Sequence, residues 1–315
     1  MRLTAMQNSI YTYLDPAELA RIADLELLAR TVISGLQGGA HRSIHHGASV
    51  EFAQYRPYAW GDDLRFVDWR LYGRSDRLHV KQFQDERNLR STILLDCSAS
   101  MDYGSGEVSK FRYAQMLAAC LVMLASGQGD AVGFAAYHRE LIAHVPARRR
   151  DGQRHRILME IDNLRPAGEE TDTAGTLRVM GDVLPARGMV VLIGDLLHPA
   201  DEMIVHLRSL RAQRHDVLVL QVSDPAEQTF PFDRSVTLVD AEDNREQFAV
   251  PEEVREAYLE NRRRHFDAIR EACLAAEIDI EEFACSEPLD MALHRFLHRR
   301  NDGLIAPSRR SQGGV

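Results

Sequence analysis

The sequence predicts an α/β protein with a doubly wound, mostly parallel sheet, and two observations support this fold class. Apolar runs over residues 92–95 and 189–194 each lead directly into an aspartate, Asp96 and Asp195. Buried parallel strands have this composition and deliver polar side chains to their carboxyl ends. Strand and helix patterns alternate along the rest of the chain, which indicates a parallel sheet with right-handed crossovers.

The individual elements follow from local signals in chain order. A helix is expected to begin at Asp15, where the acidic N-cap and Glu18 form a capping box and Pro16 occupies the first helical position, and to continue at helical spacing to Val32. Apolar periodicity then predicts the remaining elements. They are strands at 50–58 and 78–84, a helix at 110–126, a hairpin of strands at 132–137 and 140–145, helices at 154–163 and 173–184, a strand at 189–194, a helix at 200–213, a strand at 217–222, a helix at 252–276, a strand at 278–284 and a helix at 289–299.

Length and composition suggest one large domain with an extension. The 315 residues and the 45% hydrophobic share are sufficient for a sizeable core. We expect residues 1–88 to form an N-terminal helix and a charged, aromatic, β-containing extension, and residues 89–300 to form the main domain. Residues 301–315, rich in Gly, Ser and Arg, read as a disordered tail.

Charge and hydropathy restrict the partner and the compartment. A net charge of -9 argues against nucleic acid as the main partner, because phosphate contacts require a basic face. The run Arg148-Arg149-Arg150 is interpreted as a solvated face. No apolar stretch reaches the roughly 20 residues that span a bilayer, and no secretory signal is recognisable, so a cytoplasmic protein is expected.

Oxygen-bearing side chains gather where the two aspartate-ending strands stop. Asp96, Ser98 and Ser100 follow the first strand in an Asp-x-Ser-x-Ser pattern, Thr171 lies in a polar loop, and Asp195 ends the second strand. Hydroxyl and carboxylate oxygens, without cysteine or histidine, suit a hard cation. Mg²⁺ is the expected ion, with Mn²⁺ as the alternative.

Taken together, these pieces resemble the metal-ion-dependent adhesion site of von Willebrand factor A domains. The resemblance implies that Ser98, Ser100 and Thr171 are hydroxyl ligands and that Asp96 and Asp195 approach the ion directly or through water. In that family, a carboxylate from another protein completes the coordination. Glu169-Glu170 stands where glycines often precede the threonine, and these acids would either repel an acidic partner or supply an internal ligand.

A second signature covers the region from about Gly38 to Asp195. It includes the motifs Gly61-Asp62-Asp63-Leu64-Arg65 and Val67-Asp68-Trp69-Arg70 and continues with Arg74, Phe83 and Glu86 just before the first core strand. This pattern resembles the domain-of-unknown-function 58 family, which is built on a von Willebrand A-like domain. The resemblance implies a partnership with a MoxR-type AAA+ ATPase in assembling or activating other proteins. Physically, Arg65, Asp68, Trp69 and Arg74 form either a structural clamp onto the main domain or a docking surface.

We therefore predict a non-enzymatic protein-binding module, with two alternatives left open. The first is a Mg²⁺-dependent phosphatase or nuclease, although hydrolytic sites are carboxylate-rich and no general base or phosphate-clamping Lys is apparent beside the motif. The second is a structural domain with an empty metal site, plugged by Glu169 and Glu170. Cys97 lies inside the motif and is expected to be structural.

Overall fold

A six-stranded sheet with the strand order β10-β7-β6-β3-β4-β5 forms the centre of the main domain. The computed structural model describes residues 24–37, 50–58, 67–75, 77–85, 89–166, 172–184, 187–239 and 245–301. Within these residues the elements are α2 (Leu25–Gln37), β1 (Val50–Pro57), α3 (Trp69–Ser75), β2 (His79–Asp85), β3 (Arg90–Asp96), η2 (Ala99–Asp102), α4 (Lys110–Gly127), β4 (Ala131–Tyr137), β5 (Leu141–Arg148), α5 (Gln153–Asn163), α6 (Thr173–Val183), β6 (Met189–Gly194), α7 (Ala200–Ala212), β7 (Asp216–Ser223), α8 (Pro225–Thr229), β8 (Val236–Val239), β9 (Glu246–Ala249), α9 (Pro251–Ala275), β10 (Asp279–Ala284) and α10 (Leu289–Asn301).

The sheet topology confirms the predicted fold class. Five strands pair in parallel, and β5 pairs antiparallel with β4, as the predicted hairpin requires. The chain runs from β3 to β4 on one side and later returns to place β6 on the other side of β3. The strand order therefore reverses between β3 and β6, and open α/β sheets bind ligands at the carboxyl ends of strands at such a switch point.

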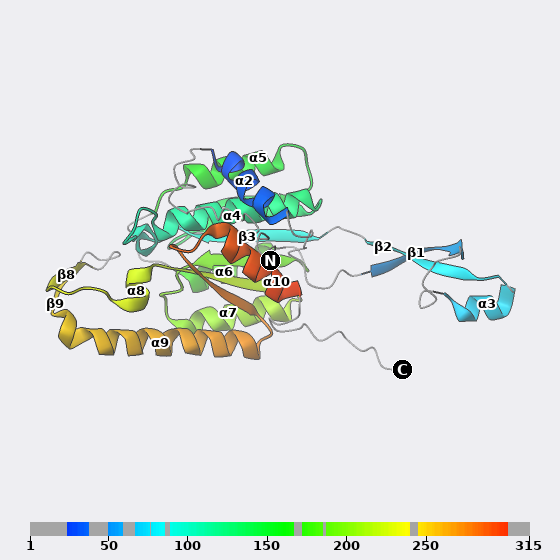
Figure 1. The fold of residues 1–315 in the computed structure, drawn as a ribbon. Coiled ribbons are helices and arrows are strands. Elements are labelled where there is room, and N and C mark those ends of the chain that lie inside the picture. Colours follow the sequence, from blue (N-terminus) through cyan, green and yellow to red (C-terminus); the bar gives the residue numbers. More distant parts are fainter. Residues whose placement is uncertain are drawn as a thin grey trace, which may run out of the picture.

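Helices cover both faces of the sheet (Figure 1). Residues of α2, α4, α5 and α10 form one buried core with the sheet, and residues of α6, α7 and α9 form the other. Helix α4 is buried on nearly every side because α2 and α5 cover the face that the sheet does not. That placement explains why its sequence is apolar almost all round.

The N-terminal helix differs from the prediction in its beginning and in its partners. Helix α2 begins at Leu25, and the Asp24 carboxylate accepts hydrogen bonds from the Glu26 and Leu27 amides. The predicted helix is therefore not continuous through residue 24, because Asp24 is the N-cap of α2. The predicted start at Asp15 lies outside the described residues. Leu28 and its buried neighbours pack into the main core, so α2 belongs structurally to the main domain.

The extension contains the predicted pair of strands and a short helix that was not predicted. β1 and β2 pair antiparallel and project with α3 beyond the end of the main sheet (Figure 1). Asp68 is buried and caps α3 by accepting a hydrogen bond from the Leu71 amide at 3.0 Å. Trp69 is 59% exposed and contacts Tyr72 edge-on, and Arg74 is also exposed.

Asp68 therefore organises the extension itself, whereas Trp69 and Arg74 lie on its surface. Arg65 lies outside the described residues, as do residues 302–315 of the predicted tail, whereas Asn301 is the last residue of α10. The short elements α8, β8 and β9 were also not predicted. Among the helices of the described part, none is both long and apolar enough to cross a membrane.

Candidate metal centre

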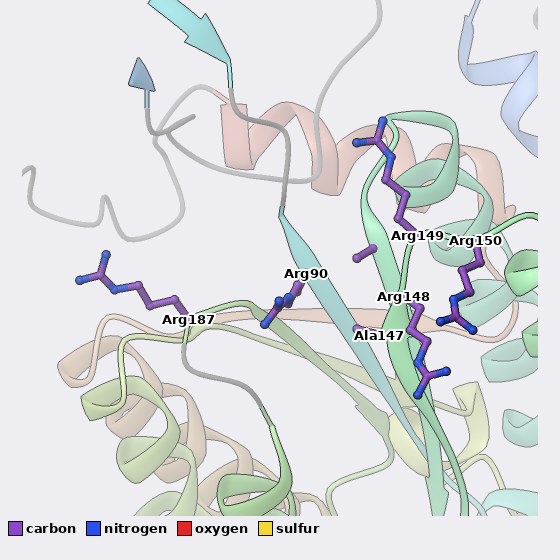
Figure 2. A pocket seen from close by; sticks show the side chains of 7 residues that line it. Arg90, Ala147, Arg148, Arg149, Arg150 and Arg187 are labelled. Atoms are coloured by element: carbon purple, nitrogen blue, oxygen red, sulfur yellow. The ribbon is translucent and has the colours of Figure 1, made fainter. Parts of the chain in front are cut away.

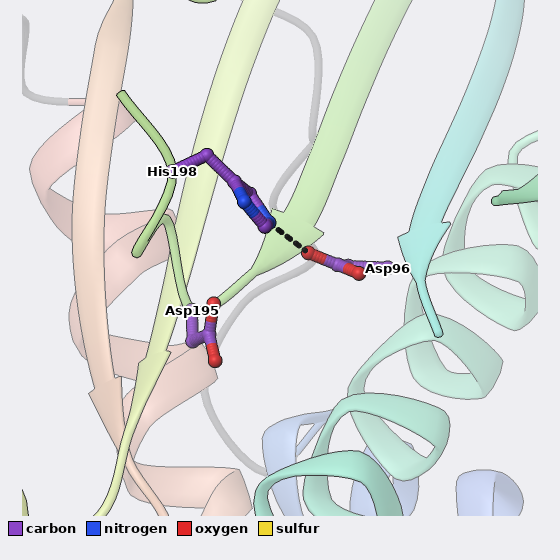
Figure 3. Close-up of side chains that lie close together, drawn as sticks. All are labelled: Asp96, Asp195 and His198. Carbon is purple, nitrogen blue, oxygen red and sulfur yellow. Dashed lines mark ion pairs between the residues drawn. The ribbon is translucent and has the colours of Figure 1, made fainter. Parts of the chain in front are cut away.

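Two buried aspartates meet at the switch point of the sheet, as the sequence predicted. Asp96 ends β3, and Asp195 follows β6, the neighbouring strand on which Ile193 pairs with Leu95. Each aspartate is only 1% exposed. Figure 3 shows the two carboxylates side by side with His198, and one ligand atom from each of the three residues lies within 4.8 Å of the others.

The last residue of β6 must be glycine for Asp96 to take this position. A Cβ added at Gly194 would lie 2.9 Å from both Cβ and Oδ2 of Asp96. Real side chains do not tolerate that separation, so the two strand ends approach closely only because Gly194 lacks a side chain.

Replacing Gly194 by alanine should displace the Asp96 carboxylate, weaken metal binding and reduce the free energy of unfolding by about 1–3 kcal/mol, as overpacking does. Gly127→Ala is the matched control, because its added Cβ would have no heavy atom within 4 Å. Urea unfolding and Mg²⁺ or Mn²⁺ titration of both variants measure the effect. Equal stability and equal metal affinity in the two variants would refute the steric argument.

The two predicted serines lie beside Asp96. The Ser98 amide donates to Asp96 Oδ1 at 2.9 Å, and this bond turns the chain immediately after β3. The Ser98 and Ser100 hydroxyl oxygens are 3.0 Å apart. The Ser100 hydroxyl also hydrogen-bonds to Asp195 and helps to lower the pKa of that carboxyl, so the pair of hydroxyls lies beside the aspartates, and Ser98 is fully buried.

His198 is a site residue that the sequence analysis missed. Leu196 adopts a left-handed backbone with φ 59°, and the Leu197 amide donates to Asp195 Oδ1 at 3.3 Å. This tight turn brings His198 Nε2 to 3.8 Å from Asp96 Oδ2. His265 of α9 stabilises the turn through a 2.7 Å hydrogen bond from Nε2 to the Leu196 carbonyl. The available signal was a histidine three residues after a strand-end acid.

A buried lysine, also unforeseen, holds the second aspartate. Lys110 is the first residue of α4, and its side chain is 0% exposed. Its ammonium donates to Asp195 Oδ2 at 2.8 Å and to Glu227 Oε1 at 2.5 Å. Glu227 also accepts from the Asp224 amide within the capping box of α8, so the network connects the site to that short helix.

The electrostatics of the two aspartates differ. Burial raises the pKa of Asp96, and the neighbouring Asp195 charge adds to this, while His198 and the Ser98 amide oppose it. Burial alone would also raise the pKa of Asp195, but the Lys110 ammonium overrides this and holds that pKa below its usual range. A bound cation would therefore stabilise the charged form of Asp96 more than that of Asp195, which Lys110 already neutralises.

The donor set fits a divalent cation. The carboxylates of Asp96 and Asp195 and the hydroxyls of Ser98 and Ser100 are the oxygen donors that Mg²⁺ and Mn²⁺ take. Asp195 is occupied on both oxygens by Lys110 and the Leu197 amide, which favours contact with an ion through water. His198 adds an imidazole, a ligand that Mn²⁺ accepts more readily than Mg²⁺. Thr171, Glu169 and Glu170 lie outside the described residues.

Cys97 has the environment of a structural residue, as expected. The thiol is fully buried and directed at the Leu95 carbonyl oxygen, 3.7 Å away. Burial raises the pKa of the thiol far above its ordinary value. A thiol in this state is a poor nucleophile at neutral pH.

Comparison with known sequences identifies the family. Residues 54–268 match the family described as "Protein of unknown function DUF58". The chain belongs to the DUF58 family. It is also 34% identical over 232 residues to the uncharacterized protein Rv1480 of Mycobacterium tuberculosis (strain ATCC 25618 / H37Rv), covering 72% of each chain. The predicted family membership is thereby confirmed, and the matched range contains the positions of Asp96, Lys110, Asp195 and His198.

Solved structures with a similar arrangement are more distant from this DUF58 protein. The conserved hypothetical protein BatB of Bacteroides thetaiotaomicron is 14% identical with a TM-score of 0.45, and the alignment covers 68% of this chain and 98% of BatB. The SpRpn10 VWA domain is 10% identical with a TM-score of 0.40, covering 65% of this chain and 94% of that domain.

Proposed function

We propose that this DUF58 protein is a non-enzymatic binding module that captures a carboxylate of a partner protein through a Mg²⁺ or Mn²⁺ ion. The observation that carries the proposal is the convergence of the Ser98 and Ser100 hydroxyls with the buried Asp96 and Asp195 carboxylates at the sheet's switch point. Neutral hydroxyls leave a bound ion electrophilic, and Mg²⁺ commonly keeps waters that an incoming oxygen ligand can replace.

Lys110 supports this proposal by its position. Its ammonium occupies one oxygen of Asp195 and shares that charge with Glu227. Asp195 therefore neutralises a bound ion less than a carboxylate without a partner would. An ion held in this way keeps more of its attraction for an outside carboxylate.

The proposed partner is a MoxR-type AAA+ ATPase, which the family resemblance implies. In this arrangement the DUF58 protein binds an acidic residue of the ATPase, or of a client protein, and the pair assembles or activates other proteins. The exposed Trp69 and Arg74 of the extension are a second proposed contact for the same partner.

One observation keeps a hydrolytic alternative open. His198 Nε2 lies 3.8 Å from Asp96 Oδ2 at the same centre, and histidine is the side chain that most often acts as a general base. The sequence around the Asp-x-Ser-x-Ser motif shows no such base, because His198 lies about 100 residues further along the chain. A Mg²⁺-dependent phosphatase or nuclease is therefore the second candidate function.

A pull-down from native lysate in Mg²⁺, repeated with EDTA, tests the binding proposal. We expect an AAA+ ATPase to be recovered in Mg²⁺ and lost in EDTA, and the loss to be reproduced in Mg²⁺ by Ser98→Ala. Recovery of the ATPase in both Mg²⁺ and EDTA would mean that the interface lies elsewhere than at the metal centre. Metal-dependent cleavage of a phosphate ester by the purified protein, abolished by His198→Ala, would favour the hydrolase instead.

A further inference from the structure

An arginine-lined pocket lies at the end of the sheet opposite the metal centre. It has a volume of about 720 Å³ and is lined by Arg90, Ala131, Ala147, Arg148, Arg149, Arg150 and Arg187. Arg90 and Asp96 are the first and last residues of β3, so the two sites are separated by about 20 Å of extended strand. A ligand of this pocket would not contact the proposed metal ion.

The strand register brings these arginines together from distant parts of the chain. Arg90 pairs with Ala131 on β4, and the neighbouring Val132 pairs with Arg148 on antiparallel β5. Arg187 precedes β6 on the other side of β3, where Gly188 passes so close to Arg90 that an added Cβ would lie 2.8 Å from the Arg90 carbonyl oxygen. Of the arginines in this pocket, only the run Arg148-Arg149-Arg150 is conspicuous in the sequence, where it is interpreted as a solvated face, because nothing local connects that run with Arg90 and Arg187.

The described lining of the pocket consists of five arginines and two alanines, so its charge is strongly positive. Figure 2 shows that the arginine side chains extend from neighbouring strand ends and loops and point in different directions. Within the described part of the chain, none of these arginines forms an ion pair, and no acidic or aromatic side chain lines the pocket. Because the whole chain carries a net charge of -9, this positive surface is a local exception to the overall charge.

We propose that this pocket binds a compact anion bearing several phosphate groups. Guanidinium groups pair with phosphate oxygens in bidentate geometry, and each terminal phosphate carries about 1.5 to 2 negative charges at neutral pH. A single carboxylate would compensate only one of the arginines. The lack of aromatic lining in the described part provides no stacking platform for a base, and the acidic remainder of the surface disfavours a long nucleic acid.

Calorimetric titration of the full-length protein with inorganic tripolyphosphate, in EDTA so that the metal centre is inactive, tests the proposal. We expect binding that Arg90→Gln combined with Arg148→Gln weakens at least about tenfold, the loss expected for charged hydrogen bonds. The charge-matched control is Arg178→Gln combined with Arg208→Gln, two exposed positions outside the pocket, which should leave affinity within about twofold. Circular dichroism checks that both variants are folded.

Two further ligands distinguish the source and the chemistry of the anion. If ATP binds as tightly as tripolyphosphate, the pocket recognises the phosphates alone. If ATP binds much more tightly, the natural ligand is a nucleotide. Both results support phosphate binding. Citrate binding as tightly as tripolyphosphate would overturn the preference for phosphate. Failure to bind tripolyphosphate at millimolar concentration, or equal weakening by the pocket and control variants, would overturn the site itself.

Discussion

Asp96→Asn should reduce metal-dependent partner binding by at least about 100-fold while leaving the fold intact. Loss of an outer-shell partner alone typically lowers metal affinity 10- to 100-fold, and this substitution removes a charge at the ion itself. Asparagine keeps the side-chain oxygen that accepts from the Ser98 amide. It also removes a buried charge whose cost is expressed in the raised pKa of Asp96, so the metal-free stability should stay equal or increase.

The variant is first titrated with Mg²⁺ and Mn²⁺. Partner binding of the variant and of the wild type is then measured at the metal concentration that saturates the wild type. Asp102→Asn is the matched control, because Asp102 ends the short helix η2 next to the site and is exposed. A metal affinity for Asp96→Asn equal to that of Asp102→Asn would remove Asp96 from the centre. A variant that binds metal weakly yet retains its partner would instead refute the metal bridge.

The sequence predicted the part of the centre that depends on local strand endings. Asp96, Ser98 and Ser100 follow one apolar strand directly, and Asp195 follows another, so parallel pairing alone brings them to one edge of the sheet. The same reasoning yielded the order and type of the main helices and strands, because their apolar periodicity is long and regular.

The rest of the centre could not be predicted because it depends on tertiary packing. Lys110 lies 85 residues from Asp195 and 117 from Glu227, and the α4 pattern does not indicate where its first side chain points. One signal for Lys110 was available in the sequence. Lys81 and Lys110 are the only lysines, and arginine is used at every other position with a permanent positive charge. His198 depends on the left-handed turn at Leu196, which residue preferences disfavour.

Short elements escaped prediction for a related reason. Helix α3 and helix α8 each start at a capping aspartate, Asp68 and Asp224, but are too short to show helical periodicity. In the N-terminal helix, the apolar spacing extends on both sides of Asp24, although Asp24 is the N-cap at which helix α2 begins. Periodicity thus indicates which face is buried but does not by itself locate the ends of a helix.

The second large effect should come from Lys110→Met, which we expect to lower the free energy of unfolding by about 3–5 kcal/mol, the cost of removing one partner of a buried ion pair. Methionine has a similar length and is apolar, so the packing of the side chain is largely kept. The loss arises because Asp195 becomes a buried charge without its ammonium, and Glu227 loses the same partner. Urea unfolding in EDTA near pH 7 measures it.

Two comparisons separate this charge effect from a simple packing defect. Adding Asp195→Asn to Lys110→Met should restore part of the lost stability, because the unpaired carboxylate is then absent. Mg²⁺ should also stabilise Lys110→Met more than the wild type, since an ion that binds the folded state stabilises it by mass action and Asp195 is then available as a direct ligand. If neither the second substitution nor Mg²⁺ recovers stability, Lys110 contributes through packing and the electrostatic link between α4 and the metal centre is wrong.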